Sequence, residues 1–209
     1  MNILFVQGNP SSDLVSGEQV IIINDILHLK KMGHNIHYEN IKVSRLYFNS
    51  VFDHIGGLIW SFTNYRRIQL LIKRHNPDIV HFHTVIPYLS FSAIFAAGKM
   101  DIPIIQTLHN GRWLCLEGSY FRNNTFCDDC VGSYGWIGVK RGCGHGQFIS
   151  LFLFLNNFIV RKFGFLFKYV SRFIAVSEFV REQHIRSGFP ESKVIVRNNG
   201  FNASSEFDV

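Results

Sequence analysis

Histidine side chains follow two apolar segments near the middle of the chain, where strands are expected to end. Residues 78–82 are followed by His83 and Thr84, and residues 102–107 lead into His109. In an open parallel sheet, ligands bind in the crevice beyond the carboxyl ends of the strands. An imidazole there can hydrogen-bond a ligand and stabilise charge that develops during a reaction. We therefore expect His83, Thr84 and His109 to face a crevice, with a buried structural histidine as the alternative.

Strand and helix patterns alternate along the chain, and this alternation would bring those residues to one edge. Strands are expected at 3–7, 36–38, 78–82, 102–107, 172–176 and 194–196. Helical spacing predicts helices around 20–29, 88–99 and 178–186, whereas 41–65 has no clear pattern. Alternating strands and helices predict an α/β fold with a doubly wound parallel sheet and helices on both faces. His81 alternates inward on its strand, so we expect it to pack inside the protein.

The composition is that of a globular protein. Of 209 residues, 47% are hydrophobic and 17% are charged, which excludes a disordered chain and fits one large domain.

A formal charge of +6 and 21 phenylalanines suit anionic partners such as phospholipid or a phosphorylated substrate. Nucleic-acid binding is not expected, because no basic motif accompanies the net charge. A dinucleotide-binding oxidoreductase is excluded, because no G-x-G-x-x-G follows the first strand.

Two segments bear on the location of the protein. Residues 1–10 contain no basic region and no small-residue cleavage site, so we expect a cytoplasmic protein. Residues 148–160 are apolar but fall short of the ~20 residues that span a bilayer, which predicts a buried or interfacial helix. Together with Arg161, Lys162 and Lys168, this segment could instead face an anionic membrane surface. A core helix that covers the sheet is the expectation for most of it.

The cysteines cluster in one glycine-rich segment, residues 112–147, which we interpret as a loop insertion. They are Cys115, Cys127, Cys130 and Cys143, with the spacing C-x11-C-x2-C-x12-C. In a cytoplasmic protein, a whole cysteine complement around a C-x2-C pair indicates a tetrahedral structural zinc site more than disulfides. His145 could replace one ligand. Four reduced thiols, or two disulfides in an exported protein, are the alternatives.

Two further positions could bind phosphate. Ser16 and Gly17 open the first helix, where free backbone N–H groups can meet a nucleotide diphosphate and glycine permits close approach. An ordinary helix N-cap by Ser16 is the alternative. Arg112 is a candidate clamp for an acceptor phosphate, since its fork of donors matches phosphate oxygens. A surface ion pair is the alternative for Arg112.

Six motifs in this order resemble the N-terminal domain of the family-four retaining glycosyltransferases. They are Ser-Gly-Glu at 16–18, Lys-Met-Gly-His at 31–34, Asn-Pro-Asp-Ile-Val-His-Phe-His at 76–83, Thr-Leu-His at 107–109, Phe-Ile-Ala-Val-Ser-Glu at 173–178 and Val-Arg-Asn-Asn-Gly-Phe-Asn at 196–202. The resemblance covers nearly the whole chain. It implies the GT-B fold, in which two Rossmann-like domains face each other across a cleft, with residues 1–202 as the N-terminal, acceptor-side domain.

The resemblance also implies roles for single residues. Ser16, Gly17 and Glu18 would bind the diphosphate of a nucleotide-sugar donor, although Ser16 replaces the first of two glycines usual in similar enzymes. His109 would be the catalytic residue that hydrogen-bonds the donor sugar. The acceptor would be bound by His83, Thr84, Arg112, Ser177 and Glu178. Zinc at the cysteines would be structural, and no catalytic metal is expected.

The last motif would mark the crossing into a C-terminal donor domain, with residues 203–209 beginning the linker. We therefore expect the donor half to be absent here and to come from a partner subunit or from the missing part of the protein. The expected function is retaining hexosyl transfer to a lipid-linked or glycan acceptor in polysaccharide or glycolipid assembly. It would take place at the inner face of the membrane, with little activity from this half alone. The alternative is a noncatalytic zinc-stapled module that binds an acceptor or a partner.

Overall fold

A computed structural model describes residues 1–10, 16–43, 59–144 and 146–199. The main strands are β1 (Asn2–Pro10), β2 (Asn35–Val43), β3 (Ile79–Phe82), β4 (Ile104–Leu108), β7 (Val170–Ala175) and β8 (Val194–Val196). The helices are α1 (Gly17–Lys31), α3 (Phe62–His75), α4 (Phe91–Gly98), α5 (Trp136–Arg141), α6 (Gln147–Lys162), α7 (Phe165–Tyr169) and α8 (Glu178–Arg186), with a 3-10 turn, η2, at Glu191–Lys193. A small hairpin pairs β5 (Phe121–Arg122) with β6 (Thr125–Phe126).

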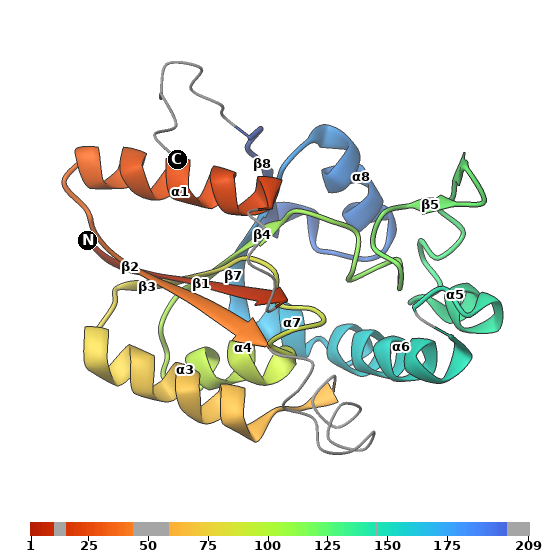
Figure 1. The fold of residues 1–209 in the computed structure, drawn as a ribbon, viewed down its shortest axis with the longest axis horizontal. Coiled ribbons are helices and arrows are strands. Elements are labelled where there is room, and N and C mark those ends of the chain that lie inside the picture. Colours follow the sequence, from red (N-terminus) through yellow and green to blue (C-terminus); the bar gives the residue numbers. More distant parts are fainter. Residues whose placement is uncertain (11–15, 44–58, 145, 200–209) are drawn as a thin grey trace.

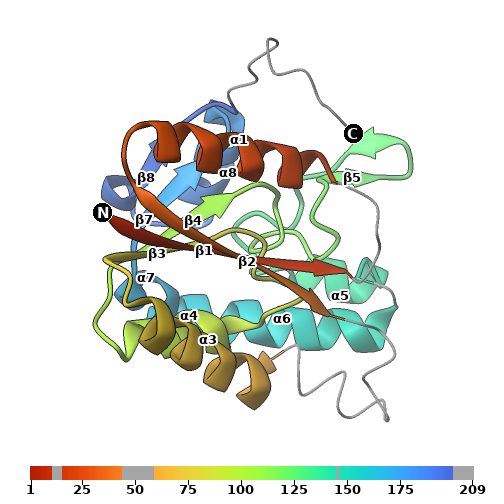
Figure 2. The same ribbon diagram turned by 60° about the vertical axis from the view of Figure 1, so that its left-hand side comes forward.

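The main strands form one six-stranded sheet in the order β2-β1-β3-β4-β7-β8, and every pair in it is parallel. Helices α1 and α8 lie on one face, and α3, α4 and α7 lie on the other (Figure 1). The turned view shows the same two helical layers with the sheet between them (Figure 2). Each connection between successive main strands contains a helix, as parallel strands require. The predicted doubly wound, Rossmann-like fold is confirmed.

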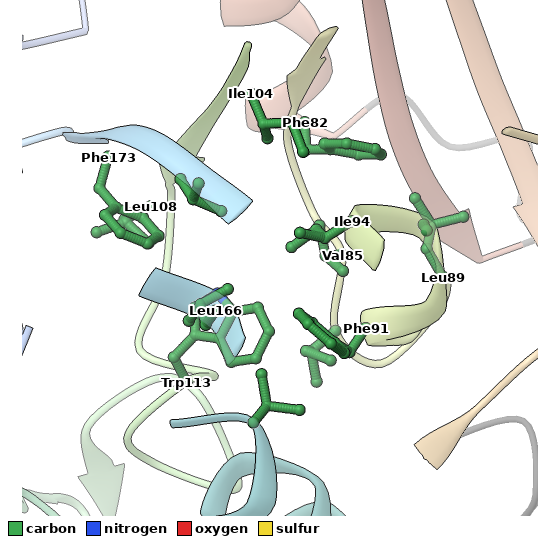
Figure 3. Packing of buried hydrophobic residues seen from close by; sticks show 14 of the residues in the cluster. Phe82, Val85, Leu89, Phe91, Ile94, Ile104, Leu108, Trp113, Leu166 and Phe173 are labelled. Carbon is green, nitrogen blue, oxygen red and sulfur yellow. The ribbon is translucent and has the colours of Figure 1, made fainter. Parts of the chain in front are cut away.

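The central strands are buried on both faces, which explains why their sequences are almost continuously apolar. In β1, Leu4, Phe5 and Val6 are at most 1% exposed. The larger hydrophobic cluster fills the layer between the sheet and α3, α4 and α7, where Phe82 and Phe173 are fully buried (Figure 3). A smaller cluster holds α1 on the opposite face.

The strand order reverses between β1 and β3, because the chain leaves β1 for β2 on one side and returns to β3 on the other. Ligands in open α/β sheets bind outside the carboxyl ends of the strands at such a point. The carboxyl end of β1 touches the loop that follows β3 through the backbone, since Gly8 N–H donates to Thr84 O at 3.1 Å. A Cβ on Gly8 would lie 2.6 Å from that oxygen, so this contact requires glycine.

The expected elements agree with the structure apart from their ends. The helix expected at 88–99 is shorter, because residues 86–89 form a turn before α4 begins. Strand β2 continues to Val43, inside the stretch that had no clear pattern. His145 lies outside the described residues, as do residues 200–209, which include the end of the last motif and the expected linker.

The expected insertion, residues 112–147, contains β5, β6 and α5 and is therefore partly regular. Its side chains contact α8 and α6. The ring of Phe126 meets that of Phe179 on α8 edge-on at a centroid distance of 5.8 Å, and Trp136 lies 5.3 Å from Phe154 on α6. The segment is thus attached to two helices of the main fold.

Polar residues of α6 hold the chain that follows β4. Asn157, one of the asparagines that interrupt the apolar run, donates from Nδ2 to Arg112 O at 2.9 Å. Arg161 donates from Nη1 to Trp113 O at 2.9 Å, and its side chain is buried. For Arg161 the alternative of a membrane-facing position is therefore wrong and the expected core position is right, because its charge is used inside the protein. The neighbouring Lys162 is exposed.

The end of α6 and the start of α7 expose aromatic side chains. Phe163 and Phe165 are 65% and 42% exposed, and their ring centroids lie 6.1 Å apart. In the part of the chain that the structure describes, no helix has both the length and the hydropathy needed to cross a bilayer.

The contact between the end of β1 and the loop after β3 leads to a stability prediction. Gly8→Ala should lower the free energy of unfolding by about 1–3 kcal/mol, because the added methyl overpacks against a backbone oxygen. Gly17→Ala is the matched control, since a Cβ there meets nothing within 4 Å, and it should change the stability by less than about 0.5 kcal/mol. Urea unfolding followed by circular dichroism measures both variants. Equal effects of the two substitutions would contradict the close-approach explanation.

Candidate functional site

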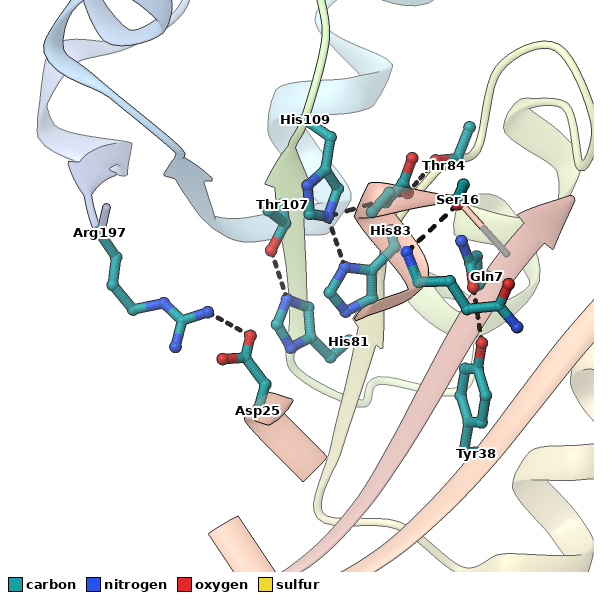
Figure 4. A network of polar contacts seen from close by, with 12 residues as sticks. Gln7, Ser16, Asp25, Tyr38, His81, His83, Thr84, Thr107, His109 and Arg197 are labelled. Carbon is teal, nitrogen blue, oxygen red and sulfur yellow. Dashed lines mark hydrogen bonds and ion pairs between the residues drawn. The ribbon is translucent and has the colours of Figure 1, made fainter. Parts of the chain in front are cut away.

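Side chains from three segments meet at the carboxyl edge of the sheet, beside the point where the strand order reverses (Figure 4). His83 follows β3, and its Nδ1 lies 2.8 Å from Nε2 of His109, which follows β4. The same His109 nitrogen is 3.8 Å from Oε1 of Glu18, in the first turn of α1. Thr84 donates its hydroxyl proton to this Glu18 oxygen. The structure therefore brings together four of the expected site residues from distant parts of the sequence.

His81 belongs to the interior of the sheet, as expected from its alternation. Its Nε2 lies 2.8 Å from Oγ1 of Thr107 on the neighbouring strand. Its ring packs against those of Phe5 and His83, with centroid distances of 4.7 and 4.3 Å. Burial, followed by the positive charge of Arg197, lowers the pKa of His81 to about 3. The buried ring of His81 thus supports the ring of His83 by packing against it.

Burial also keeps the two site histidines uncharged. It lowers the pKa of His109 to about 4, with a smaller contribution from Arg197. It lowers the pKa of His83 well below the usual value, with help from the neighbouring His81 and His109. Burial raises the pKa of Glu18, and hydrogen bonds from Thr84 oppose this effect. At neutral pH both imidazoles are neutral, so each offers one N–H donor and one acceptor nitrogen.

The N-terminus of α1 opens toward this cluster. Ser16 is the N-cap, because its Oγ accepts from Gln19 N at 3.2 Å. The N–H groups of Gly17 and Glu18 donate to no acceptor among the described residues. A helix N-terminus with free N–H groups favours anions. The capping role of Ser16 and an anion site at Gly17 are thus compatible in one geometry.

A small pocket lies beside the histidines. It is lined by His83, Thr84, Val85, Ile86, Gln106, Thr107, Leu108, His109, Asn110, Arg112 and Trp113. Its volume is about 10 Å³, room for about one water molecule, whereas ligand pockets are typically about 300–1,000 Å³. Two buried polar atoms at this pocket, His83 Nε2 and Gln106 Oε1, have no partner in the described part of the chain. An unsatisfied buried polar atom costs about 1–3 kcal/mol, so both are available to a ligand.

The other expected acceptor residues lie in different surroundings. Arg112 lines the pocket, and its Nη1 lies 3.4 Å from Leu116 O. Ser177 is the N-cap of α8 and accepts from Val180 N at 3.2 Å. Glu178 begins α8 with an exposed carboxylate, 3.9 Å from Arg181. Neither Ser177 nor Glu178 lines the small pocket.

Two groups of side chains have the chemistry to hold a metal. Glu18, His83 and His109 place their ligand atoms within 4.8 Å of one another, the one such set of three among the described residues. Nitrogen and carboxylate donors of this kind suit zinc or another transition metal. The cysteines line a second cavity, beside β6 and α5.

Sequence reasoning missed Gln106 and Trp113 in the pocket and Asn157 behind it. A polar residue inside a short buried strand was an available signal, because Gln106 interrupts the apolar run of β4 and is 2% exposed. Nothing in the sequence indicated that Asn157 would bind the carbonyl of Arg112, since the two are 45 residues apart.

Because buried histidines resist protonation in the fold, we expect the free energy of unfolding to fall in mild acid. Unfolded histidine titrates near a pKa of about 6.5, whereas His81 and His109 titrate at about 3 and 4 in the fold. Between these values the unfolded chain binds more protons, so the free energy of unfolding should fall as the pH falls. In this range each such histidine lowers the free energy of unfolding by about 1.4 kcal/mol for every pH unit that the pH falls. The raised pKa of Glu18 acts in the opposite sense, but it is a single group.

His184 on α8 provides the test away from the site, since burial lowers its pKa to about 4. Its Nδ1 lies 2.7 Å from Val180 O, a bond that a glutamine amide can reproduce. Urea unfolding between about pH 7 and about pH 5 should show a smaller slope for His184→Gln than for the wild type, by about 1.4 kcal/mol per pH unit. Identical slopes would show that this histidine does not titrate as proposed.

Solved structures share this fold. UDP-N-acetylglucosamine 2-epimerase from Rickettsia bellii superposes with a TM-score of 0.50 at 14% identity, over 94% of this chain and 44% of that protein. Anabaena Alr3699/HepE in complex with UDP-glucose gives a TM-score of 0.47 at 16% identity, over 96% of this chain and 44% of that protein. The chain therefore spans about half the length of the proteins that it matches. At these identities the likeness shows the fold alone.

Sequence comparison identifies the family. No curated protein sequence matches the chain. The profile of Glycosyltransferase Family 4 matches residues 26–205, which is most of the chain. The expected resemblance and the expected N-terminal-type GT-B fold are both confirmed. The chain belongs to glycosyltransferase family 4.

Proposed function

We propose that the chain forms the acceptor-side wall of a retaining glycosyltransferase site, where a hexosyl group passes from a nucleotide sugar to an acceptor hydroxyl. One observation carries the proposal. Glu18, His83 and His109 converge at the switch point beside the open N-terminus of α1, in a chain that belongs to a glycosyltransferase family. The cluster combines uncharged donors with an anion-binding helix end, which is what transfer from a sugar diphosphate needs.

The donor diphosphate would lie against the N–H groups of Gly17 and Glu18. As the bond between the anomeric carbon and the diphosphate oxygen breaks, negative charge develops on that oxygen. The positive end of the α1 dipole and its free N–H groups would stabilise this charge. His109 would donate an N–H to the donor sugar, because its low pKa keeps the ring neutral and able to donate without a net charge. This assignment uses no metal, and the expected absence of a catalytic metal stays a prediction.

The acceptor would approach over the ends of β3 and β4. His83, Thr84 and Arg112 line this approach, and Ser177 and Glu178 would extend it along the start of α8. A lipid-linked or glycan acceptor in polysaccharide or glycolipid assembly fits the family. The exposed rings of Phe163 and Phe165 next to Lys162 would permit a peripheral contact with the inner face of an anionic cell membrane.

The site needs a second wall. The pocket of about 10 Å³ cannot enclose a nucleotide sugar, and the proteins of this fold that match the chain are about twice its length. We infer that a donor-binding domain or partner subunit closes the site, and that this half alone transfers little or no sugar. A noncatalytic acceptor-binding or partner-binding module is the alternative, and the activity experiment below separates the two.

The anion site at α1 is tested by Gly17→Val. The side chain would project into the space where the diphosphate is proposed to lie, so UDP and UDP-N-acetylglucosamine should bind at least about tenfold more weakly. Isothermal titration of the chain measures this, and thermal unfolding shows whether the fold is intact. Unchanged affinity in a folded variant would place the diphosphate elsewhere.

The role of His109 is tested by transfer assays on the chain joined to its donor half, with UDP-glucose, UDP-N-acetylglucosamine and GDP-mannose as donors. His109→Ala should lower kcat by about 10²–10³-fold, the effect of losing one donor to the transition state. His109→Gln keeps an N–H donor and should retain part of the activity.

His28→Ala is the matched control for that experiment, since His28 is exposed on the same helix as Glu18, and it should leave transfer unchanged. Full turnover by His109→Ala would remove His109 from the mechanism. No turnover by the wild type under any pairing would favour the noncatalytic binding module.

A further inference from the structure

The segment between β4 and α6 is long and has little regular structure of its own. Its elements are the two-residue strands β5 and β6 and the six-residue helix α5. Connections longer than about 12–15 residues without their own packing are uncommon in compact domains. The inner end of the segment is anchored, because Trp113 and Leu114 are buried. The outer end is held less closely: Phe126 contacts Phe179 of α8, but Phe121 and Phe126 remain 55% and 58% exposed.

A cavity of about 230 Å³ lies inside this segment, and every cysteine of the chain lines it. The four are Cys115, Cys127, Cys130 and Cys143. They come from four separate places: the turn after β4, the end of β6, the following turn and the end of α5. The cavity is open to solvent, because its lining includes the exposed Phe121 and Arg141, and its volume is several times the ~30 Å³ of one water molecule. Because all four thiols line this one cavity, we looked for a ligand that sulfur atoms would bind.

Two of the four sulfurs have hydrogen-bond donors beside them. Gly118 N–H donates to Cys115 Sγ at 3.4 Å, and Arg141 Nη1 lies 3.7 Å from Cys127 Sγ. Donors of this kind stabilise metal-bound thiolates from the second layer around an ion. Gly138 keeps the space beside Cys130 open, because a Cβ there would lie 3.3 Å from its sulfur.

The cavity is wider than a closed metal site. Zinc–sulfur bonds of about 2.3 Å place the sulfurs of a tetrahedron about 3.8 Å apart. Among the described residues, no three of the cysteine sulfurs lie within 4.8 Å of one another. Binding therefore requires the thiols to move toward one another across the cavity.

We propose that the four cysteines bind one zinc ion in a tetrahedral site that staples the segment between β4 and α6. Each thiol releases its proton to solvent as its thiolate binds the ion. Cys115 follows Arg112 and Trp113, which line the small pocket, so the ion would also restrict the loop that carries them. Zinc suits four sulfur donors better than magnesium or calcium, which require oxygen ligands.

The first experiment uses the full chain purified under reducing conditions. Elemental analysis should give one zinc per chain. The thiols should be protected from Ellman's reagent until a strong chelator is added, and all four should then react. Replacement by cobalt should give the intense charge-transfer absorption of a tetrahedral cobalt–thiolate site. These measurements need no variant, so they decide the question even where a cysteine substitution prevents folding.

Variants locate the ion. The double substitution Cys127→Ser and Cys130→Ser should remove the zinc and lower Tm, because the staple is lost. His83→Ala is the matched control, since it disrupts the other candidate metal group and should retain one zinc per chain. Ser133→Ala, in the turn beside Cys130, should retain it as well.

Three results would overturn the proposal. The first is a reduced chain that holds no zinc after dialysis against the metal. The second is a pair of disulfides, found by mass spectrometry of the unreduced protein. The third is zinc that is lost in His83→Ala and kept in the double cysteine variant, which would assign the ion to the histidine cluster.

Discussion

The parallel pairing of β1, β3 and β4 is the constraint on which the site depends. Both faces of these strands are covered by helices, so polar side chains gather where the strands end. The register that pairs Val6 with Phe82, and Phe82 with Gln106, brings the following loops to the same level. The backbone hydrogen bond from Gly8 of β1 to Thr84 then ties the end of β1 to the loop that follows β3. A shift of one residue in either strand would move every side chain to the opposite face of the sheet and disperse the cluster.

Burial gives that cluster its chemistry. Imidazoles withdrawn from water lose affinity for protons, so His83 and His109 remain neutral donors and acceptors at neutral pH. The same withdrawal leaves His83 Nε2 and Gln106 Oε1 without partners among the residues that the structure describes, a cost that a bound ligand would remove. Stability and function are opposed here, because the desolvation that prepares the site for a ligand also destabilises the fold in acid.

A second layer of structure supports the loop after β4. The main-chain carbonyls of Arg112 and Trp113 are bound by Asn157 and Arg161 of α6. A buried arginine in this position is costly, and its burial lowers its pKa to about 10, but two carbonyl contacts and the neighbouring ring of Tyr134 compensate. The cysteine-lined cavity lies farther along the same loop. The metal and the sugar nucleotide would therefore act on one segment from opposite ends, through different chemistry.

The sequence by itself determined the order of the main strands, the fold class and the strand ends at which His83 and His109 stand, because apolar periodicity is a local signal and parallel strands end at the same edge of a sheet. It also indicated that the cysteines belong together. It did not indicate α3, which begins in the stretch without a clear pattern. Only the tertiary structure decided that Glu18 meets His109, that Gln106 lines the pocket and that Arg161 is buried. Contacts between residues far apart in sequence depend on how helices pack on the sheet, and helical spacing alone cannot tell which side of α6 faces the loop. An arginine beside an apolar run fits a membrane surface or a buried carbonyl equally well until the neighbouring chain is in place.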